Sequence, residues 1–150
     1  MMKPPLISLP YPAEFLIPHR PPMLFVRQII ERKKDTALVD AIVPDEGIFF
    51  DQNSGMVLPE LYIEIMAQAI ATINGWDALN ESTTTVRGFL VGMHHIEFNS
   101  YAKPGQTIWI ELIRKLEFGE IIIFDGIIRT TREIVIQGEV KVWVDKNNNV

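Results

Sequence analysis

The sequence of 150 residues contains no cysteine, which excludes disulfides, thiolate zinc sites and cysteine nucleophiles. Positive charge is also scarce: 14 Lys and Arg stand against 19 Asp and Glu, and the net charge of −5 argues against a nucleic-acid-binding protein. The apolar runs are shorter than the roughly 20 residues that cross a bilayer, so we expect no membrane span. What is present, 47% hydrophobic and 22% charged residues, is typical of a folded globular domain.

Proline is concentrated at the N-terminus, where residues 1–22 hold seven of the ten prolines. Proline fixes φ and disfavours helix in the residue before it, so we expect an extended arm over this range. The apolar run Phe15-Leu16-Ile17 predicts that the end of the arm packs on the rest of the chain. The prolines also interrupt every stretch that could form the apolar part of a secretory signal. We therefore expect one domain over residues 1–150, with this arm, in a cytoplasmic protein.

Charge is distributed unevenly along the chain. Residues 1–34 carry six basic residues against Glu14 and Glu31, a local charge of +4, whereas residues 35–150 carry eight basic and seventeen acidic residues, a local charge of −9. The basic residues of the first part favour one of two interpretations, a solvated hairpin tip or a docking patch for an acidic carrier protein. They are Lys3, Arg20, Arg27, Arg32, Lys33 and Lys34.

Hydrophobic patterning predicts two strands, one helix and four longer strands, in that order. The first two strands cover 23–32 and 36–43, joined by a turn at Lys33-Lys34-Asp35, and the later ones cover 87–98, 106–117, 121–131 and 134–145, with a bulge at Gly126. The helix covers 59–74, from Pro59 to a stop at Asn74-Gly75. Because this helix is apolar almost all round, it has to be buried on every side. We therefore predict an α+β fold in which a long, curved antiparallel sheet wraps around one central helix.

The polar residues of the helix form one narrow row, because Glu60, Glu64, Gln68 and Thr72 are spaced by four. Such a row is usual for a helix that faces solvent. On a helix that is otherwise apolar, a row one residue wide indicates instead a slot lined by these side chains. A carboxyl group that faces an apolar slot can transfer a proton near neutral pH, so Glu64 is a candidate acid.

Several segments of the chain follow one another as in a known family. They are Leu16-Ile17-Pro18-His19-Arg20 leading to Val26, the pair Phe49-Phe50, the helix run Glu64-Ile65-Met66-Ala67-Gln68, the strand from Leu90 to Phe98, and Lys103-Pro104-Gly105. In this order, the sequence resembles the hotdog-fold 3-hydroxyacyl-[acyl-carrier-protein] dehydratases. Among these it is most similar to the dehydratase-like proteins encoded with aryl-polyene synthesis enzymes.

The resemblance implies a hotdog fold and a lyase that removes water from 3-hydroxyacyl thioesters in the synthesis of fatty acids or polyene lipids. The acyl group would be carried on the 4'-phosphopantetheine of an acyl carrier protein or of coenzyme A, with no other cofactor and no metal. The resemblance also implies a dimer, formed with a second copy or with a related hotdog chain. Glu64 takes the position of the family's catalytic acid, and Gln68 one turn later helps to hold the site. The residues expected at the substrate are Phe50, Met66, Gly92, His94 and His95.

The sequence departs from the family at the catalytic histidine, which in the family follows the Phe-Phe pair. Counted from that pair, the position is held by Asn53, and an amide is not a general base at neutral pH. His94 or His95 could take this role, because adjacent residues of a strand point to opposite faces and one of them should face the helix. Asp51 is another candidate base. His19 is interpreted as a structural histidine with satisfied hydrogen bonds.

Two other functions stay open at this point. Because family active sites are built across the dimer, the chain could be a non-catalytic acyl-binding or stabilising subunit whose partner supplies the missing histidine. It could also be a hotdog thioesterase in which Glu64 or Asp51 activates water. Dehydration and hydrolysis are separable by assay, because only hydrolysis releases a free thiol.

Overall fold

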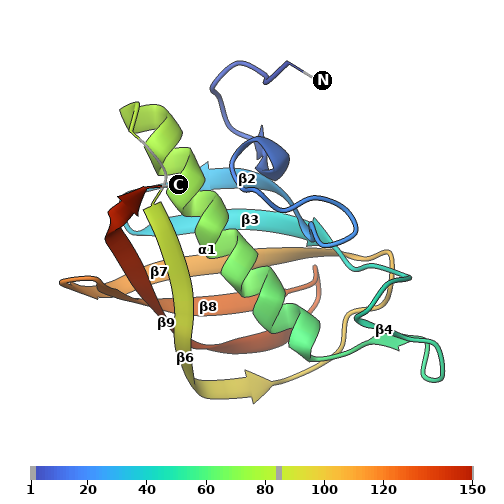
Figure 1. Cartoon of the computed structure of the whole chain (residues 1–150). Helices are drawn as coiled ribbons and strands as arrows, with labels where there is room; N and C mark the ends of the chain where they lie inside the picture. Colours follow the sequence, from blue (N-terminus) through green and yellow to red (C-terminus); the bar gives the residue numbers. More distant parts are fainter. Residues whose placement is uncertain (1–2, 84–85, 150) are drawn as a thin grey trace.

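The computed structural model describes residues 3–83 and 86–149 and shows one long helix, α1, crossing the concave face of a curved sheet (Figure 1). The remaining residues, among them the start of the expected arm, lie outside the described part of the chain. The elements are β1 (Tyr11–Pro12), the 3₁₀ turn η1 (Ala13–Phe15), β2 (Val26–Arg32), β3 (Thr36–Ile42), β4 (Phe50–Asp51), β5 (Met56–Val57), α1 (Glu60–Glu81), β6 (Val86–Phe98), β7 (Thr107–Phe118), β8 (Ile121–Arg129) and β9 (Ile134–Asn149).

Seven strands form one antiparallel sheet in the order β1-β2-β3-β7-β8-β9-β6, and β4 with β5 forms a separate short hairpin. The predicted turn between the first two long strands is present, and the N–H of Lys33 donates to the carbonyl oxygen of Thr36 at 2.9 Å. The helix contacts β2, the second strand of the sheet order, and β6, the last one. The predicted architecture, a sheet wrapped around one buried helix, is therefore confirmed.

The helix is longer than predicted, because it continues past Asn74-Gly75 and ends at Glu81, where Ser82 adopts the left-handed conformation with φ of 53°. Gly75 has another purpose. A Cβ atom at this position would lie 2.3 Å from the carbonyl oxygen of Leu16, so glycine is required for the close approach of the arm. The predicted stop was wrong because a glycine within a helical pattern can serve packing instead of termination.

The end of the arm is fixed on the helix, as the sequence predicts. Tyr11, Leu16 and Ile17 are buried, and the ring of Tyr11 packs on that of Trp76 with 5.5 Å between the centroids. The arm is not extended throughout, because η1 forms one 3₁₀ turn between β1 and the segment that leads to β2.

The interior between α1 and the sheet is almost entirely apolar. Met66 of the helix is fully buried there and faces Gly126 of β8, where a Cβ atom would lie 3.1 Å from the methionine sulfur. The predicted bulge at Gly126 was wrong, because β8 keeps its register through this residue and the shift in its pairing with β7 falls between Arg114 and Leu116. The glycine makes room for the helix instead.

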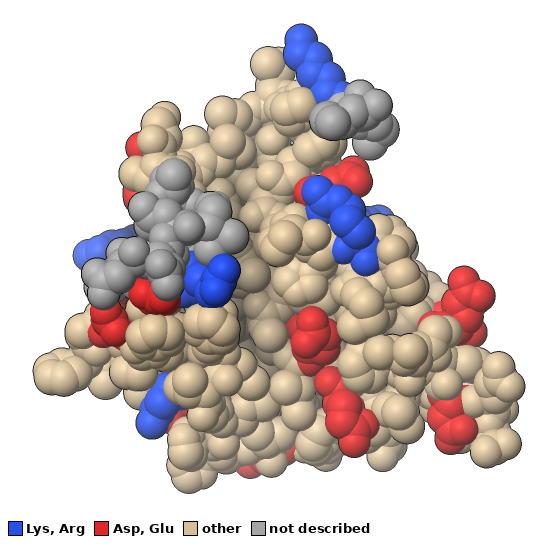
Figure 2. Space-filling model, in the orientation of Figure 1, with Lys and Arg blue, Asp and Glu red and all other residues tan. Residues whose placement is uncertain are grey.

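Two of the six basic residues near the N-terminus are engaged in ion pairs with buried or half-buried carboxylates. Arg27 pairs with Asp40, and Arg32 donates two hydrogen bonds of 2.9 and 2.8 Å to Asp77 of the helix. On the face shown in Figure 2, Lys and Arg are scattered and do not gather into one patch. Of the two interpretations of these basic residues, the docking patch therefore loses Arg27 and Arg32, whose charges are paired within the fold.

Candidate functional site

The predicted polar row lies on the side of α1 that faces the arm and the start of β2. Glu60 is exposed and Glu64 half-buried, whereas Gln68 and Thr72 are buried. The hydroxyl of Thr72 donates to the carbonyl oxygen of Gln68 at 2.8 Å, within the helix. The row therefore leads from solvent into the protein, as expected for a slot and unlike a solvent-facing stripe.

Gln68 ties the helix to the chain that enters β2. Its side chain is 1% exposed, and its Oε1 accepts the backbone N–H groups of Phe25 at 2.9 Å and Val26 at 3.4 Å. Its Nε2 donates to the carbonyl oxygen of Met23 at 2.7 Å and to Oε1 of Glu64 at 3.0 Å. An amide that is hydrogen-bonded at both its oxygen and its nitrogen cannot rotate without losing these bonds, so it holds the Glu64 carboxyl in one orientation.

His19 lies beside Glu64. Its Nε2 is 3.9 Å from Oε1 of the carboxyl, and the two side chains are 32% and 33% exposed. Its Nδ1 is buried and has no hydrogen-bond partner. The satisfied hydrogen bonds expected for this histidine are therefore missing at Nδ1, although buried ring nitrogens are normally hydrogen-bonded, and its structural role stays a prediction. The sequence placed this residue in a family motif but contained no local signal of its distance to the helix.

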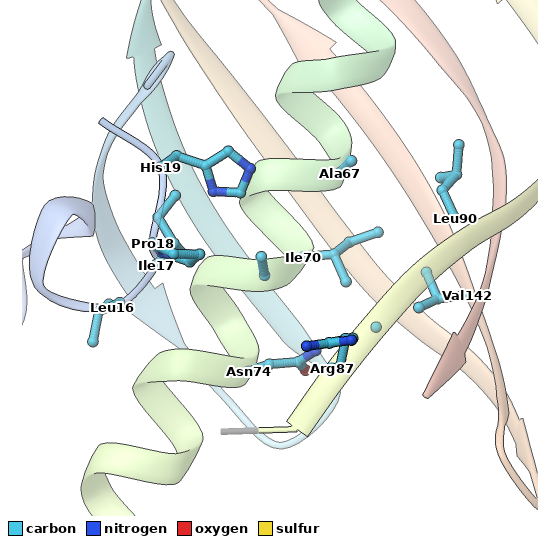
Figure 3. Close-up of a pocket in the computed structure, with 12 residues that line it drawn as sticks. Leu16, Ile17, Pro18, His19, Ala67, Ile70, Asn74, Arg87, Leu90 and Val142 are labelled. Atoms are coloured by element: carbon cyan, nitrogen blue, oxygen red, sulfur yellow. The ribbon is translucent and has the colours of Figure 1, made fainter. Parts of the chain in front are cut away.

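The arm reaches this position along a defined path. It runs antiparallel to the helix, from Leu16 beside Gly75 to His19 near Ala67, and the imidazole ring points toward the helix (Figure 3). The guanidinium of Arg20 donates to two backbone carbonyl oxygens of this segment, at 2.9 and 2.6 Å. The ring is thus presented by a segment that is fixed before and after it.

A cavity of about 350 Å³ lies between the arm, α1 and the strands β6 and β9. Its walls are mostly apolar, with Ile17 and Ile70 among the residues that line it. Its polar residues lie at opposite ends, His19 at one and Asn74 with Arg87 at the other (Figure 3). An apolar cavity of this volume with a few polar groups is typical of a small-molecule site.

The catalytic candidates Asp51 and Asn53 lie in the β4–β5 hairpin and are not part of the group formed by Glu64, Gln68 and His19. Asn53 is exposed in the turn, and its backbone N–H donates to the carboxylate of Asp51 at 3.0 Å. Among the described residues, neither is in hydrogen-bond or ion-pair contact with Glu64, and their catalytic roles stay predictions. Phe50 is half-buried against the core. Met66 is fully buried in the core, not on the wall of the cavity.

His94 and His95 are both exposed on β6, because the strand is irregular at this point. His95 has a φ of 55°, and the pairing of β6 shifts between His94 and Glu97. The expected alternation, with one imidazole facing the helix, is therefore broken, and within the described part of the chain neither ring pairs with Glu64. Gly92 lies next to the first of them, since a Cβ atom there would be 3.5 Å from Nε2 of His94.

The site as a whole combines a carboxyl, an imidazole and a fixed amide beside an apolar cavity. Within residues 3–83 and 86–149, no three His, Asp or Glu side chains come together as a metal site. In the same part of the chain, no helix has the length and apolar character needed to cross a membrane. The arrangement can hold an apolar chain and exchange protons with a polar group at its end.

The chain also matches a known protein family. The ApeP-like family, described as ApeP dehydratase, matches residues 11–150. The bifunctional enzyme LpxC/FabZ of Chlorobaculum tepidum is 28% identical over an alignment of 140 residues, which covers 89% of this chain and 29% of that protein. The chain therefore spans less than a third of the length of this curated relative.

Solved structures share the fold. The dehydratase heterocomplex ApeI:P from Xenorhabdus doucetiae matches with a TM-score of 0.79 at 22% identity, over 91% of this chain and 92% of that one. A hypothetical thioesterase of Streptococcus pneumoniae, solved with coenzyme A, matches with a TM-score of 0.62 at 11% identity, over 78% and 84%. The helix wrapped in an antiparallel sheet is thus the hotdog fold that the sequence predicts. Because the family match covers nearly the whole chain, this protein belongs to the ApeP-like family of dehydratases.

Proposed function

We propose that the chain is a dehydratase that converts 3-hydroxyacyl thioesters into 2-enoyl thioesters and water, with Glu64 as the acid. The placement of Glu64 carries this proposal: Gln68 donates to its carboxyl at 3.0 Å, and the neighbouring His19 lines an apolar cavity. In this reaction, a protonated carboxyl donates its proton to the 3-hydroxyl, which leaves as water. Membership of a dehydratase family supports the reaction class.

The cavity and the relatives support an acyl thioester as the class of substrate. Apolar walls suit the acyl chain of a fatty-acid-like or polyene precursor, since burial of its CH₂ groups is favourable. The FabZ part of the bifunctional relative's name and the coenzyme A of the Streptococcus structure support an acyl group carried on 4'-phosphopantetheine, either of an acyl carrier protein or of coenzyme A. The proposed reaction needs no further cofactor, and we place it in the cytoplasm.

The test compares two glutamates of the same helix row. Glu64→Gln removes the acid and keeps the side-chain shape, so the conversion of 3-hydroxybutyryl-pantetheine to the enoyl product should fall by about 100-fold or more. Glu60→Gln, one turn earlier and exposed, is the matched control and should keep the rate. Ultraviolet absorbance of the enoyl thioester reports the reaction. Equal rates in the two variants, or no conversion by the unmodified protein with or without a related hotdog chain, would contradict the proposal.

A second function, a subunit of a hetero-oligomeric dehydratase, is favoured by the edge of the sheet. β6 is the last strand of the sheet order and is 13 residues long, with Phe89, Leu90 and Val91 exposed. Such an edge is a template for pairing with another chain. The ApeI:P structure is described as a heterocomplex. Counted from the Phe-Phe pair, Asn53 stands where the resemblance expects a histidine. A partner would then supply the missing histidine.

Co-purification tests this second function. A related hotdog chain with a histidine after its Phe-Phe pair should form a stable complex whose activity depends on that histidine. Val91→Lys on the β6 edge should weaken the complex, and Leu6→Lys, on the exposed arm, is the matched control. A homodimer that ignores this partner would exclude the subunit role.

Thioester hydrolysis is a third function, suggested by the description of the Streptococcus relative as a hypothetical thioesterase. The dehydration assay also tests it when a thiol reagent is included. Release of free thiol without enoyl product would favour hydrolysis over dehydration.

A further inference from the structure

The ring of His19 is placed for a chemical role that the acid alone does not fill. It lines the cavity at the end nearest Glu64, and its Nε2 lies 3.9 Å from Oε1 of that carboxyl (Figure 3). Each of the two side chains keeps about a third of its surface exposed, at 32% and 33%. His19 lines the cavity and the Glu64 carboxyl lies beside its ring, so a substrate that extends from the cavity past the imidazole would reach the carboxyl.

The ring nitrogens of His19 have no hydrogen-bond partner in the described part of the chain. Nδ1 is buried without a hydrogen-bond partner, although buried polar atoms of folded proteins are nearly always paired. Nε2 makes no hydrogen bond with Glu64 either, because 3.9 Å exceeds hydrogen-bond length. Neither ring nitrogen is therefore engaged in a hydrogen bond within the described part of the chain, which leaves Nε2 available to a substrate.

Separate elements hold the two side chains in place. The carboxyl of Glu64 is held by Gln68, which is itself bonded to the segment entering β2. The arm is held on the helix by the contact of Leu16 with Gly75, and the hydrogen bonds of Arg20 within the arm order the backbone that carries the ring. The separation of imidazole and carboxyl is therefore set before a substrate binds, as a catalytic pair requires.

We propose that His19 is the base of the dehydration and acts with Glu64 of the same chain, an assignment that rests on the proposed function. Nε2 removes a proton from C2 of the acyl group, and the electron pair of that C–H bond forms the C2–C3 double bond as the C3–O bond breaks. Glu64 gives its proton to the leaving hydroxyl, and water leaves. Transfer of the proton from Nε2 to the resulting carboxylate returns both residues to their starting states.

The geometry favours this base over the other candidates. Asn53 is exposed in a separate hairpin, and the carboxylate of Asp51 accepts a hydrogen bond from its backbone. His94 and His95 are exposed at an irregular part of the β6 edge. Of the three histidines, all of them in the described part of the chain, His19 is the one with a ring nitrogen within 4 Å of the Glu64 carboxyl.

The first experiment separates the base from the acid. Butyryl-pantetheine has no 3-hydroxyl and cannot lose water, but a base beside its C2 can exchange the C2 protons with D₂O, which NMR follows. We expect exchange by the unmodified protein, exchange within about tenfold by Glu64→Gln, and a loss of about 100-fold or more in His19→Asn. Exchange by His19→Asn at the unmodified rate would overturn the assignment.

The second experiment measures dehydration of 3-hydroxybutyryl-pantetheine. His19→Asn should lower kcat by about 100-fold while KM changes by less than about threefold, because the base acts in the transition state. His19→Ala leaves space beside the cavity, and added imidazole should restore its rate by about tenfold, which a merely structural residue would not allow. Glu14→Gln, half-buried on the same arm, is the matched control and should keep the rate. Absence of imidazole rescue in a folded His19→Ala variant would count against the assignment.

The outcomes distinguish the two proposals. If the unmodified protein forms no enoyl product, alone or with a related hotdog chain, the proposed function fails and the base assignment fails with it. If the unmodified protein is active and His19→Asn is equally active, the base assignment fails by itself. If His19→Asn does not fold, as judged by its melting curve, His19→Gln takes its place in both experiments.

Discussion

The two sides of α1 contact the rest of the protein in different ways. Toward the sheet the contact is apolar packing, in which the flexible side chain of Met66 meets Gly126. Toward the arm the contact is polar and close: Gln68 makes hydrogen bonds to the segment entering β2, and Gly75 allows the backbone of Leu16 to approach. The residues proposed for catalysis lie on the second side.

This difference indicates a division of roles. Apolar packing tolerates substitutions that keep volume, whereas a hydrogen bond depends on distance and direction. The sheet side of the helix therefore supplies stability that depends on volume, and the arm side supplies a fixed geometry for Glu64 and His19. Substitutions on the two sides should have different effects.

The largest effect is expected from Gln68→Met. The variant keeps about the same volume but removes the hydrogen bonds to the N–H groups of Phe25 and Val26 and to the carbonyl oxygen of Met23, at about 1 kcal/mol for each bond. Urea denaturation should show a loss of about 3 kcal/mol in the free energy of unfolding, and dehydration should slow because Glu64 is released. Met66→Leu, on the sheet side, should lose less than about 1.5 kcal/mol. Equal losses would contradict the division of roles.

Gly75→Ala should reverse the usual order of helix propensity. Alanine in a helix is normally favoured over glycine by about 1 kcal/mol, but here its Cβ would lie 2.3 Å from a backbone oxygen of Leu16. We expect thermal and urea unfolding to show a loss of about 1–3 kcal/mol. The comparison is Gly126→Ala, whose Cβ would lie closest to the flexible end of Met66 and which should lose less. A stabilised Gly75→Ala variant would show that the arm does not lie against the helix.

The ion pair of Arg32 with Asp77 joins β2 to the second half of the helix. Its two hydrogen bonds are 2.9 and 2.8 Å long, and the carboxylate side chain is 29% exposed. Asp77→Asn should lower the free energy of unfolding by about 1 kcal/mol or less, because solvent screens such pairs. The loss should shrink further in about 1 M salt. An equal loss of unfolding free energy at low and high salt would mean that the loss comes from packing and not from charge.

The smallest effect is a pH dependence that comes from Tyr62 of the helix. Burial raises the pKa of its phenol above the ordinary value, and its oxygen accepts the N–H of Ala102 at 3.2 Å. The folded state therefore binds this proton more tightly than the unfolded state, so the free energy of unfolding falls as the pH rises above about 10. Tyr62→Phe should show a shallower fall between about pH 9 and 11. Equal slopes would mean that the phenol titrates alike in both states.

Much of the fold could be predicted from the sequence because it depends on local patterns. The strand runs follow from their hydrophobic residues, and the start of the helix follows from Pro59. The row from Glu64 to Gln68 could be predicted as a slot, because a polar stripe on an apolar helix has to find partners inside the protein.

The rest depends on contacts between distant segments, which local patterns do not encode. Gly75 resembles a helix stop until the backbone of Leu16 is known to lie against it. His19 resembles a structural motif residue until the arm is known to run along the helix to Glu64. The irregular strand at His95 likewise changes which side chains face the helix. In each case the tertiary contact decides the role of the residue.

The most direct test of the site is a crystal structure of the protein with the amide analogue of 3-hydroxybutyryl-pantetheine, in which NH replaces the thioester sulfur. We predict that the acyl chain lies in the cavity between the arm and α1, with its 3-hydroxyl within about 3.2 Å of the Glu64 carboxyl and its C2 beside Nε2 of His19. An analogue bound at the β4–β5 hairpin, beside Asn53 and away from Glu64, would contradict this placement.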